Sequence, residues 1–501
     1  MAATLVQGTF VLERFETDGT PVLHPSGAVL VEHGMVQAVG RFADLAARHP
    51  DARPSGSARS AVIPGLVNAH HHVGLTPLQL GSPDLPLELW FGSRLALRDV
   101  PLFEDTLFSA FEMIASGVTT VQHLHSRAPG TPDDVLGAAR EVVRAYRAIG
   151  MRASYSMALR DQNRLVYEAD QDFVARLPPA LRPAMAAHFA RFALTLADQA
   201  AVFHALHQEL AADPLVQVQL APSNLHWLSD AALEAAGTMA QDAGVPMHMH
   251  LLETPYQKAY ATRRTGGSAL AHLHAVGLTG PRLTLGHGVW MTEADIGLCA
   301  RTGTRVCHNC SSNFRLKSGV APLNRFQAHG IPVAIGMDEA GINDDRDMLQ
   351  EMRLVLHVHR EPGIDAPCPT AAGVLRMATE HGAGTTPFGD RIGCLSPGCA
   401  ADLVVLDWDV VTHPYQNPDL PLLDVLVQRA KTQAVRTVMV GGDVVYDDGR
   451  FTRMDRAAVL REIAGRLRQP LSGAEDARRS LARDVMPHVR RFYEGYLDST
   501  P

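Results

Sequence analysis

Residues 62–81, VIPGLVNAHHHVGLTPLQLG, begin as an apolar run and reach three consecutive histidines, His70, His71 and His72. Such a run is typical of a strand buried on both faces, as in a parallel sheet covered by helices. Side chains two positions apart on a strand point to the same side, so His70 and His72 can direct two imidazoles at one point. The stretch therefore predicts either packed histidines or half of a metal site.

Seven further apolar or β-branched runs recur along the chain, separated by stretches with helical periodicity. They are VTTVQHL (118–124), MRASYSMAL (151–159), LVQVQLAPS (215–223), VPMHMHLLE (245–253), PRLTLGHG (281–288), TRVCHNC (304–310) and IPVAIGMDE (331–339). The alternation predicts an α/β fold built from βα units, and eight units predict a (β/α)8 TIM barrel over residues 62–393. This fold places its chemistry at the carboxyl ends of the strands. Polar and ionisable residues gather at those ends here.

The two ends of the chain have a different pattern. Residues 1–61 and 394–453 contain short alternating strands broken by glycine turns, which predicts a small β-sandwich domain assembled from both ends. Residues 160–192 interrupt the barrel pattern with a longer, partly helical insertion, and we expect a lid there. Residues 454–501 are expected to form a charged helical segment at the surface.

Composition excludes several classes of function. The 501 residues carry a formal net charge of −8, and their Lys and Arg form no basic stripe for nucleic acid or anionic lipid. No apolar run is long enough to span a membrane, and the start lacks a signal-peptide pattern. We therefore expect a cytoplasmic protein whose six cysteines are reduced. Cys307 and Cys310 form a C-x-x-C without a second such pair, so we interpret both as ordinary buried thiols rather than a redox or metal pair.

Pairs of histidines two residues apart indicate which histidines could bind a metal. Five His-x-His pairs occur, two on helical patterns (272/274 and 357/359) and three at strand ends (70/72, 123/125 and 248/250). Residues two apart on a helix do not face each other, so we interpret the helical pairs as surface or packing residues. Imidazole and carboxylate ligands from separate strand ends suit zinc, with iron as the second choice. The strand ends supply His70, His72, His250, His287 and Asp338.

The order of motifs resembles a known superfamily. PGLVNAHHH, HMHLLE, LGHGV, HNCSSNFRLKSGVAPL and GMDEAGINDDRDMLQEMRL follow one another as in the amidohydrolases, in particular the mononuclear-metal group with cytosine, guanine and S-adenosylhomocysteine deaminases and triazine hydrolases. The resemblance implies that His70, His72, His250 and Asp338 bind the metal. It implies that Glu253 carries protons and that His287 assists at the water. His71 is expected to face away, and His248 to support a ligand or pack.

Two features qualify the resemblance. The deaminases usually have Thr-Asp-Gly after the eighth strand, whereas this chain has Met337, Asp338 and Glu339. This difference changes the surroundings of the ion and makes the substrate analogy weaker than the metal analogy. No lysine stands at a strand end to form the carbamylated bridge of the two-metal members, so we expect a single divalent ion.

The expected reaction is hydrolysis of a C–N bond. A metal-bound hydroxide, held also by Asp338, attacks an sp² carbon, His287 polarises the attacked group and Glu253 protonates the leaving nitrogen. The first hypothesis is deamination of an aminated N-heterocycle. The alternative is hydrolysis of a urea, carbamate, thiocarbamate or amide with the same metal site. A third, non-enzymatic hypothesis is a scaffold that kept the fold and lost the activity.

The substrate pocket is expected at the same strand ends. Its predicted members are Trp90 and Phe91 after the first strand, His125 after the second, Asn224, His226 and Trp227 after the fourth, and His308 after the seventh. A ring of aromatic side chains predicts a flat or aromatic small-molecule substrate. The resemblance also implies a homodimer or larger homo-oligomer.

Overall fold

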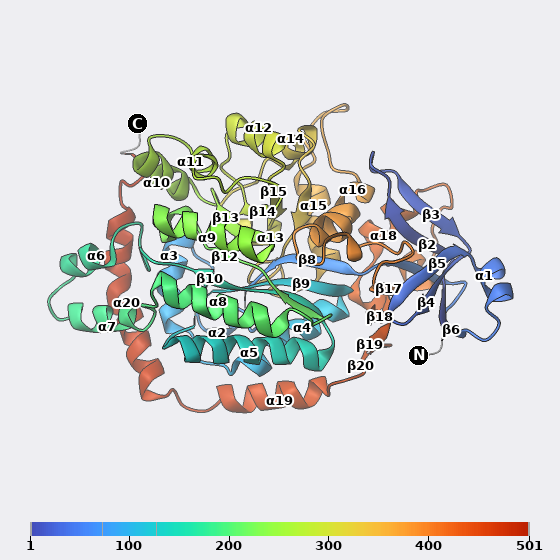
Figure 1. Cartoon of the computed structure of the whole chain (residues 1–501), viewed down its shortest axis with the longest axis horizontal. Coiled ribbons are helices and arrows are strands. Elements are labelled where there is room, and N and C mark those ends of the chain that lie inside the picture. Colours follow the sequence, from blue (N-terminus) through green and yellow to red (C-terminus); the bar gives the residue numbers. More distant parts are fainter. Residues whose placement is uncertain (1–2, 73, 127, 499–501) are drawn as a thin grey trace.

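The computed structural model describes residues 3–72, 74–126 and 128–498, and a strand lies in every one of the predicted runs (Figure 1). These strands are β8 (Leu66–His71), β9 (Val118–His125), β10 (Arg152–Leu159), β11 (Val216–Val218), β12 (Ala221–Pro222), β13 (Met247–Leu251), β14 (Leu283–His287), β15 (Arg305–His308) and β16 (Val333–Ile335).

The strands pair in parallel in two groups. One sheet has the order β11-β10-β9-β8, with β12 also on β10, and the other has the order β13-β14-β15-β16. Two isolated parallel bridges, Leu220 with Met247 and His71 with Asp338, link the groups. Because all of these pairs are parallel, the carboxyl ends of the strands lie at one end of the molecule. The strand order thereby brings together histidines that are far apart in the sequence.

Helices alternate with these strands and cover them (Figure 1). The longer ones are α4 (Leu102–Ala115), α5 (Pro132–Ile149), α8 (Leu196–Leu210), α9 (Asp230–Ala243), α12 (Glu293–Thr302) and α15 (Met348–Val358). Shorter helices include α1 (Phe42–Arg48), α2 (Pro77–Leu80), α3 (Leu87–Ser93), α10 (Pro255–Thr265), α11 (Ala269–Ala275), α13 (Cys310–Arg315), α14 (Leu323–Ala328), α16 (Ala371–Arg376), α17 (Trp408–Thr412) and α18 (Leu422–Arg429).

Helix α5 illustrates why these segments are helical. Thr131 forms a capping box with Asp134, and Pro132 occupies the first turn, where its missing N–H costs nothing. Gly150 ends the helix in a left-handed conformation (φ 81°). Between these signals, Val142 and other apolar residues recur on one face and are buried in the main core. Each fully buried side chain of this size contributes roughly 1.5–3 kcal/mol.

Strands from both ends of the chain form two further sheets. A four-stranded sheet has the order β5-β4-β1-β6, from β1 (Thr4–Gln7), β4 (Gly27–Glu32), β5 (Met35–Arg41) and β6 (Arg53–Gly56). A seven-stranded sheet has the order β20-β19-β18-β17-β7-β2-β3, from β2 (Phe10–Phe15), β3 (Pro21–Pro25), β7 (Ser60–Pro64), β17 (Leu403–Asp407), β18 (Val435–Val440), β19 (Asp443–Asp447) and β20 (Arg450–Phe451). Val29 of the first sheet and Val62 and Val405 of the second share one buried cluster. The first predicted run is thus divided, because its first residues pair in this seven-stranded sheet and only Leu66 onward joins the parallel strands.

The insertion and the C-terminal segment pack against each other. The insertion contains α6 (Asp170–Arg176) and α7 (Arg182–Ala190), and the last segment contains α19 (Arg456–Leu467) and α20 (Gly473–Tyr493). Figure 1 shows α19 leading away from β20 and α20 passing α6, α7 and α3. Phe173 of the insertion, Val485 of α20 and Leu89 of α3 lie in one buried apolar cluster. This cluster attaches α20 to α3 and to the insertion.

One expectation about the cysteines is wrong. Cys394 and Cys399 are paired as a disulfide, with their Cα atoms 6.7 Å apart across a separation of five residues. Both lie in the loop that precedes β17, whose turns bring the two residues together. Cys299, Cys307 and Cys310 are buried free thiols, and Cys368 is exposed. Within the described ranges, no helix combines the length and apolar character that crossing a membrane requires.

A buried ion pair ties the parallel strands to the seven-stranded sheet. The Arg152 guanidinium donates to both carboxylate oxygens of Asp402, at 2.7 and 3.0 Å. The Gly441 amide donates to the same carboxylate at 2.7 Å. Arg152 and Asp402 are 6% and 1% exposed, so neither charge has water as a substitute partner.

Removal of one partner should therefore be costly. We expect Asp402→Asn to lower the free energy of unfolding by about 3–5 kcal/mol, because it leaves the Arg152 charge buried without its counter-charge. Denaturant unfolding followed by circular dichroism measures this loss. Asp409→Asn is the matched control, since the Arg59–Asp409 pair is exposed (77% and 56%) and should change stability by less than about 1 kcal/mol. Equal midpoints for the two variants would contradict this role of the ion pair.

Candidate active site

Three imidazoles converge where β8 and β13 end. Nε2 of His70 lies 3.0 Å from Nε2 of His72, and Nε2 of His72 lies 3.1 Å from Nε2 of His250. The spacing of two along β8 puts the first two side chains on one side of the strand. The parallel sheet order brings in the third from β13, far away in the sequence.

The remaining ring nitrogens of these histidines are anchored. Nδ1 of His72 donates to the Leu124 carbonyl at 2.6 Å, and Nδ1 of His250 donates to the Ser223 carbonyl at 2.8 Å. A carbonyl accepts only from an N–H, so both Nδ1 atoms carry a proton, and each Nε2 presents a lone pair when its ring is neutral. Burial and the neighbouring histidines keep the pKa of His70 and of His250 well below the ordinary value, whereas contact with Asp338 raises the pKa of His72.

Asp338 faces the same point from the loop after β16. Its Oδ1 lies 3.2 Å from Nε2 of His72, and Ser312 Oγ donates to Oδ2 at 2.6 Å. Burial disfavours the charged form, but contact with the His72 ring and the hydrogen bond from Ser312 lower the pKa of Asp338. Asp338 has a left-handed backbone (φ 53°), a conformation that non-glycine residues rarely adopt and that clusters at functional sites. The carboxylate is therefore ionised and held toward the imidazoles.

These four side chains fit a divalent metal ion. When the rings are neutral, lone pairs on several nitrogens and a carboxylate oxygen point at one another, and a cation at the centre satisfies all of them. Ligand atoms about 2.0–2.1 Å from a tetrahedral ion lie roughly 3.3 Å apart, close to the 3.0–3.2 Å found here. Nitrogen and oxygen donors of this kind suit zinc or iron.

Glu253 and His287 complete the group. Nε2 of His287 lies 3.7 Å from Oε2 of Glu253 and 3.7 Å from Oδ2 of Asp338. Nδ1 of His287 donates to Oδ1 of Asn313 at 2.9 Å, and Nε2 accepts from Asn309 at 3.2 Å. Burial raises the pKa of Glu253, which helps this carboxyl to hold a proton near neutral pH. Glu253, His287 and Asp338 are therefore close enough for a proton to pass among them, directly or through a water molecule.

Two glycines make room for His70. A Cβ at Gly286 would lie 2.9 Å from Cε1 of His70, and a Cβ at Gly336 would lie 2.4 Å from Cβ of His70. Real Cβ atoms do not make such contacts, so only glycine fits next to this ring. The glycines in the LGHG and IGMD motifs are explained by this close approach.

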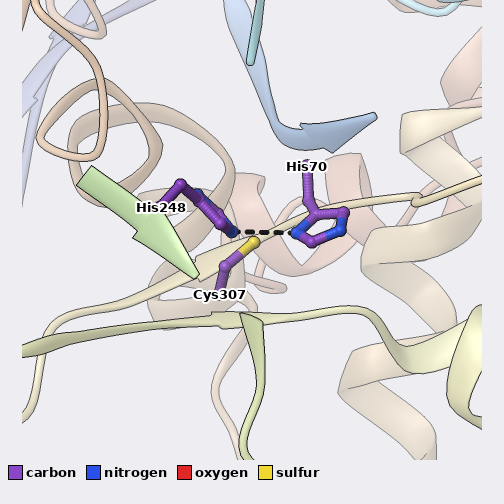
Figure 2. A group of neighbouring side chains, drawn as sticks. All are labelled: His70, His248 and Cys307. Carbon is purple, nitrogen blue, oxygen red and sulfur yellow. Dashed lines mark hydrogen bonds between the residues drawn. The ribbon is translucent and has the colours of Figure 1, made fainter. Parts of the chain in front are cut away.

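His70 is also held from behind. Nδ1 of His70 and Nε2 of His248 are 2.9 Å apart, and Figure 2 shows the sulfur of Cys307 beside this hydrogen bond. A ligand whose Nε2 faces the ion carries its proton on Nδ1, so His248 is the acceptor. The middle histidine of the triplet turns away, as expected: Nε2 of His71 lies 3.1 Å from Ser109 Oγ.

A cavity opens beside these groups. The predicted aromatic residues Trp90, Phe91 and Trp227 line it, and so do two arginines that the sequence reasoning missed. The Arg94 guanidinium lies 4.5 Å from the Trp90 ring centre, and that of Arg160 lies 3.4 Å from the Trp227 ring centre. The complete lining is His72, Leu87, Trp90, Phe91, Arg94, Leu124, Ser126, Ala158, Arg160, Ala221, Ser223, Trp227, His250, Glu253, His287, Leu316, Asp338 and Glu339.

The sequence positions of Arg160 and Arg94 could have indicated that they line the cavity. Arg160 is the first residue after β10, which is a strand-end position like those of the histidines. Arg94 follows Trp90 by four residues at the end of α3, so the two side chains share a helix face. Glu339, noted in the sequence only as an added charge, bonds to Arg94 through Oε1 at 2.9 Å.

Four predicted pocket residues lie outside this lining. His125 stacks on Tyr155, and His226 makes tilted ring contacts with Tyr167 and Trp227. Asn224 caps the short helix Leu225–Trp227 by accepting from the Leu225 amide, and Nε2 of His308 bonds to Nε2 of His359 at 2.8 Å. A strand end determines where a residue lies but not which way its side chain turns, and neighbouring rings or backbone groups hold these four.

Comparisons with known proteins identify the family of this chain. The profile of the family described as "Amidohydrolase family" matches residues 61–445, and "Imidazolonepropionase-like composite domain, bacteria" matches residues 27–52. A 5-methylthioadenosine/S-adenosylhomocysteine deaminase from Nitratidesulfovibrio vulgaris (strain DSM 19637 / Miyazaki F) is 32% identical over 443 residues, which cover 87% of this chain and 91% of that protein.

Two solved structures extend the likeness to three dimensions. An adenosine deaminase from Xanthomonas campestris with bound zinc has a TM-score of 0.76 and 28% identity, covering 93% of this chain and 99% of that one. An atrazine chlorohydrolase from Arthrobacter aurescens TC1, complexed with zinc, has a TM-score of 0.79 and 21% identity, covering 92% and 99%. The second likeness is one of fold.

The hydrogen bond between His70 and His248 should strengthen metal binding. We expect His248→Ala to lower the affinity for a divalent ion by about 10- to 100-fold. His70 loses the partner that fixes the orientation of its ring and the position of its proton. Competition with a chromogenic chelator measures the affinity. His274→Ala, on the exposed surface of α11, is the control and should bind the ion as the parent does. Unchanged affinity in His248→Ala would show that the bond does not support the ligand.

Proposed function

The chain belongs to the amidohydrolase family and is a hydrolytic enzyme that acts on C–N bonds; on that premise we propose that it deaminates the adenine ring of small nucleosides. The candidate substrates are 5′-methylthioadenosine, S-adenosylhomocysteine and adenosine, after the names of its relatives. The observation that carries the proposal is the set of His70, His72, His250 and Asp338, with Glu253 and His287 beside it, opening into an aromatic cavity.

We propose the matching architecture as well. The parallel strands would form one closed eight-stranded barrel over residues 62–393, with the bridges Leu220–Met247 and His71–Asp338 at the joins. Residues 1–61 and 394–453 would form the small β-sandwich, and 454–501 a helical extension. The shared buried cluster of the two terminal sheets supports this division.

Four residues would hold the ion. His70, His72, His250 and Asp338 would bind one divalent metal, with zinc as the first choice because the solved relatives contain it and iron as the second. When bound, the ion supplies charge stabilisation and brings the pKa of a coordinated water from 15.7 to about 7.

The protein's own groups then move the protons. Asp338, fixed by Ser312, would take the one proton that the attacking water loses, and Nε2 of His287 lies 3.7 Å from the same carboxylate. Glu253 delivers a proton to the leaving nitrogen, which would otherwise depart as a very basic anion. Its raised pKa suits a group that must be protonated and deprotonated in each turnover.

The cavity walls favour a flat, polarisable ring. Trp90 and Trp227 present aromatic faces, and each carries an arginine on one side, which restricts how its ring can turn. A purine placed against such faces gains stacking energy without losing its in-plane hydrogen bonds. This supports an aminated heterocycle over an open-chain amide.

Ammonia release tests the proposal directly. Zinc-loaded enzyme should convert at least one of the three nucleosides to its inosine form with equimolar ammonia. Glu253→Gln should keep its metal yet lose about 10²- to 10⁴-fold of kcat, because it cannot carry a proton. Metal analysis and an ammonia assay on the same samples check both. A Glu253→Gln enzyme as active as the parent would rule out Glu253 as the proton carrier. Amine release from aryl ureas or carbamates without nucleoside turnover would favour the alternative hydrolase.

Glu339 is the strongest candidate for a substrate contact. Arg94 holds its Oε1, while Oε2 is buried and has no hydrogen-bond partner among the described residues. A buried carboxylate oxygen without a donor is costly, and a donor on the substrate would satisfy it. We propose that Glu339 accepts a hydrogen bond from an N–H or O–H of the bound nucleoside.

The neutral isostere tests this contact. Glu339→Gln should raise KM by about 10- to 100-fold, since a hydrogen bond to a charged group contributes roughly 1.5–3 kcal/mol, while kcat changes little. Steady-state kinetics on the best nucleoside separate the two parameters. Glu234→Gln, at an exposed position of α9, should have parental values. A fall in kcat with KM unchanged would place Glu339 in the chemistry rather than in binding.

A further inference from the structure

A second cluster of buried metal-ligating side chains lies near the carboxyl end of β15. Nitrogen or sulfur atoms of His308, Cys310 and His359 all lie within 4.8 Å of one another. The three residues are 1%, 2% and 6% exposed. None of them belongs to the candidate active site, and none lines its cavity.

Local structure explains how these residues meet. His308 is the last residue of β15, and Cys310 is the first residue of α13. His359 follows the last residue of α15, and its carbonyl accepts from Nδ2 of Asn324 at 2.9 Å. The cluster therefore joins one strand end, one helix start and one helix end.

Hydrogen bonding alone satisfies the cluster poorly. Nε2 of His308 lies 2.8 Å from Nε2 of His359, and a neutral pair of rings can place only one proton between these atoms. Nδ1 of His308 is buried without a partner among the described residues. Close approach of two Nε2 atoms is also the signature of the candidate metal centre, where the spacings are 3.0 and 3.1 Å. The same spacing here, with a thiol beside it, points to an ion.

We propose that His308, Cys310 and His359 bind a second divalent ion, zinc, with a structural role. Two imidazoles and a thiolate are donors that zinc prefers, whereas magnesium and calcium require oxygen ligands. Binding replaces the S–H bond by a sulfur–metal bond, and the proton leaves to solvent. The ion would hold α13 and the end of α15 against β15.

The surroundings can balance the charge. Glu351, buried on α15, accepts from the Ser311 amide at 3.0 Å, next to Cys310 in the chain. One thiolate and one carboxylate neutralise a divalent ion, so the buried site carries no net charge. Burial raises the pKa of the Cys310 thiol and of the Glu351 carboxyl.

The two cysteines of the CHNC motif therefore have different surroundings. Cys307 lies beside the His70–His248 hydrogen bond (Figure 2), whereas Cys310 lies with His308 and His359. The sequence interpretation compared Cys307 and Cys310 only as a pair with each other. The structure divides them between two histidine groups, so each can be tested by itself.

Cobalt spectroscopy tests the second site without any assay of activity. The full-length chain, with exposed Cys368 replaced by Ser to remove an adventitious ligand, is stripped of metal and titrated with Co²⁺. We expect two ions per chain by elemental analysis and a thiolate-to-cobalt charge-transfer band in the near ultraviolet. The candidate active site has only nitrogen and oxygen ligands, so the band reports the cysteine site alone.

Variants assign the band. Cys310→Ala and His359→Gln should each lose it and reduce cobalt from two ions per chain to one, whereas Cys307→Ala should keep both. Circular dichroism shows which variants remain folded, and two independent ligand variants guard against loss of one through misfolding. No band in the parent, or a band that survives Cys310→Ala and disappears in Cys307→Ala, would overturn the proposal. Nucleoside deamination can fail or succeed without affecting this result.

Discussion

The structure depends on unprotonated imidazole nitrogens that face one another beside an ionised carboxylate. Backbone carbonyls of Leu124 and Ser223 accept from Nδ1 of His72 and of His250, so each Nε2 offers a lone pair when its ring is neutral. Such an arrangement is unfavourable in a dry interior unless a cation occupies the centre. Ser312, Asn313 and the neighbouring glycines serve this requirement, since each fixes or makes room for a group that faces the centre.

The same requirement organises the chemistry around it. Glu253 and His287 stand next to Asp338 without belonging to the set that faces the ion directly, which leaves them free to exchange protons. The aromatic residues Trp90 and Trp227 also line the cavity, and an arginine guanidinium lies against each ring. In the proposed mechanism, the side chains at the centre hold the ion, those next to them transfer protons and those in the cavity wall contact the substrate.

Much of this could be predicted from local pattern. The spacing of two at His70 and His72 and the strand ends at His250, His287 and Asp338 predicted the convergent set, because parallel strands end at one edge. The pattern did not show which way the side chains of four other strand-end residues turn. His125 and His226 contact Tyr155 and Tyr167, respectively. Asn224 caps a short helix, and His308 bonds to His359. Cys394 and Cys399 were expected to be reduced, and a loop instead pairs them.

By itself, the sequence determined the alternation of strands and helices and the residue types at each strand end. It also determined that both ends of the chain form short strands. Hydrophobic period and glycine turns are local properties, so they can be recognised without the tertiary structure. Tertiary structure alone decided the rest. It turned Arg94 and Glu339 into the cavity, packed α20 against the insertion, and separated Cys307 from Cys310 into different histidine groups. These outcomes depend on side-chain direction and on contacts between segments far apart in the chain, which no single-residue pattern contains.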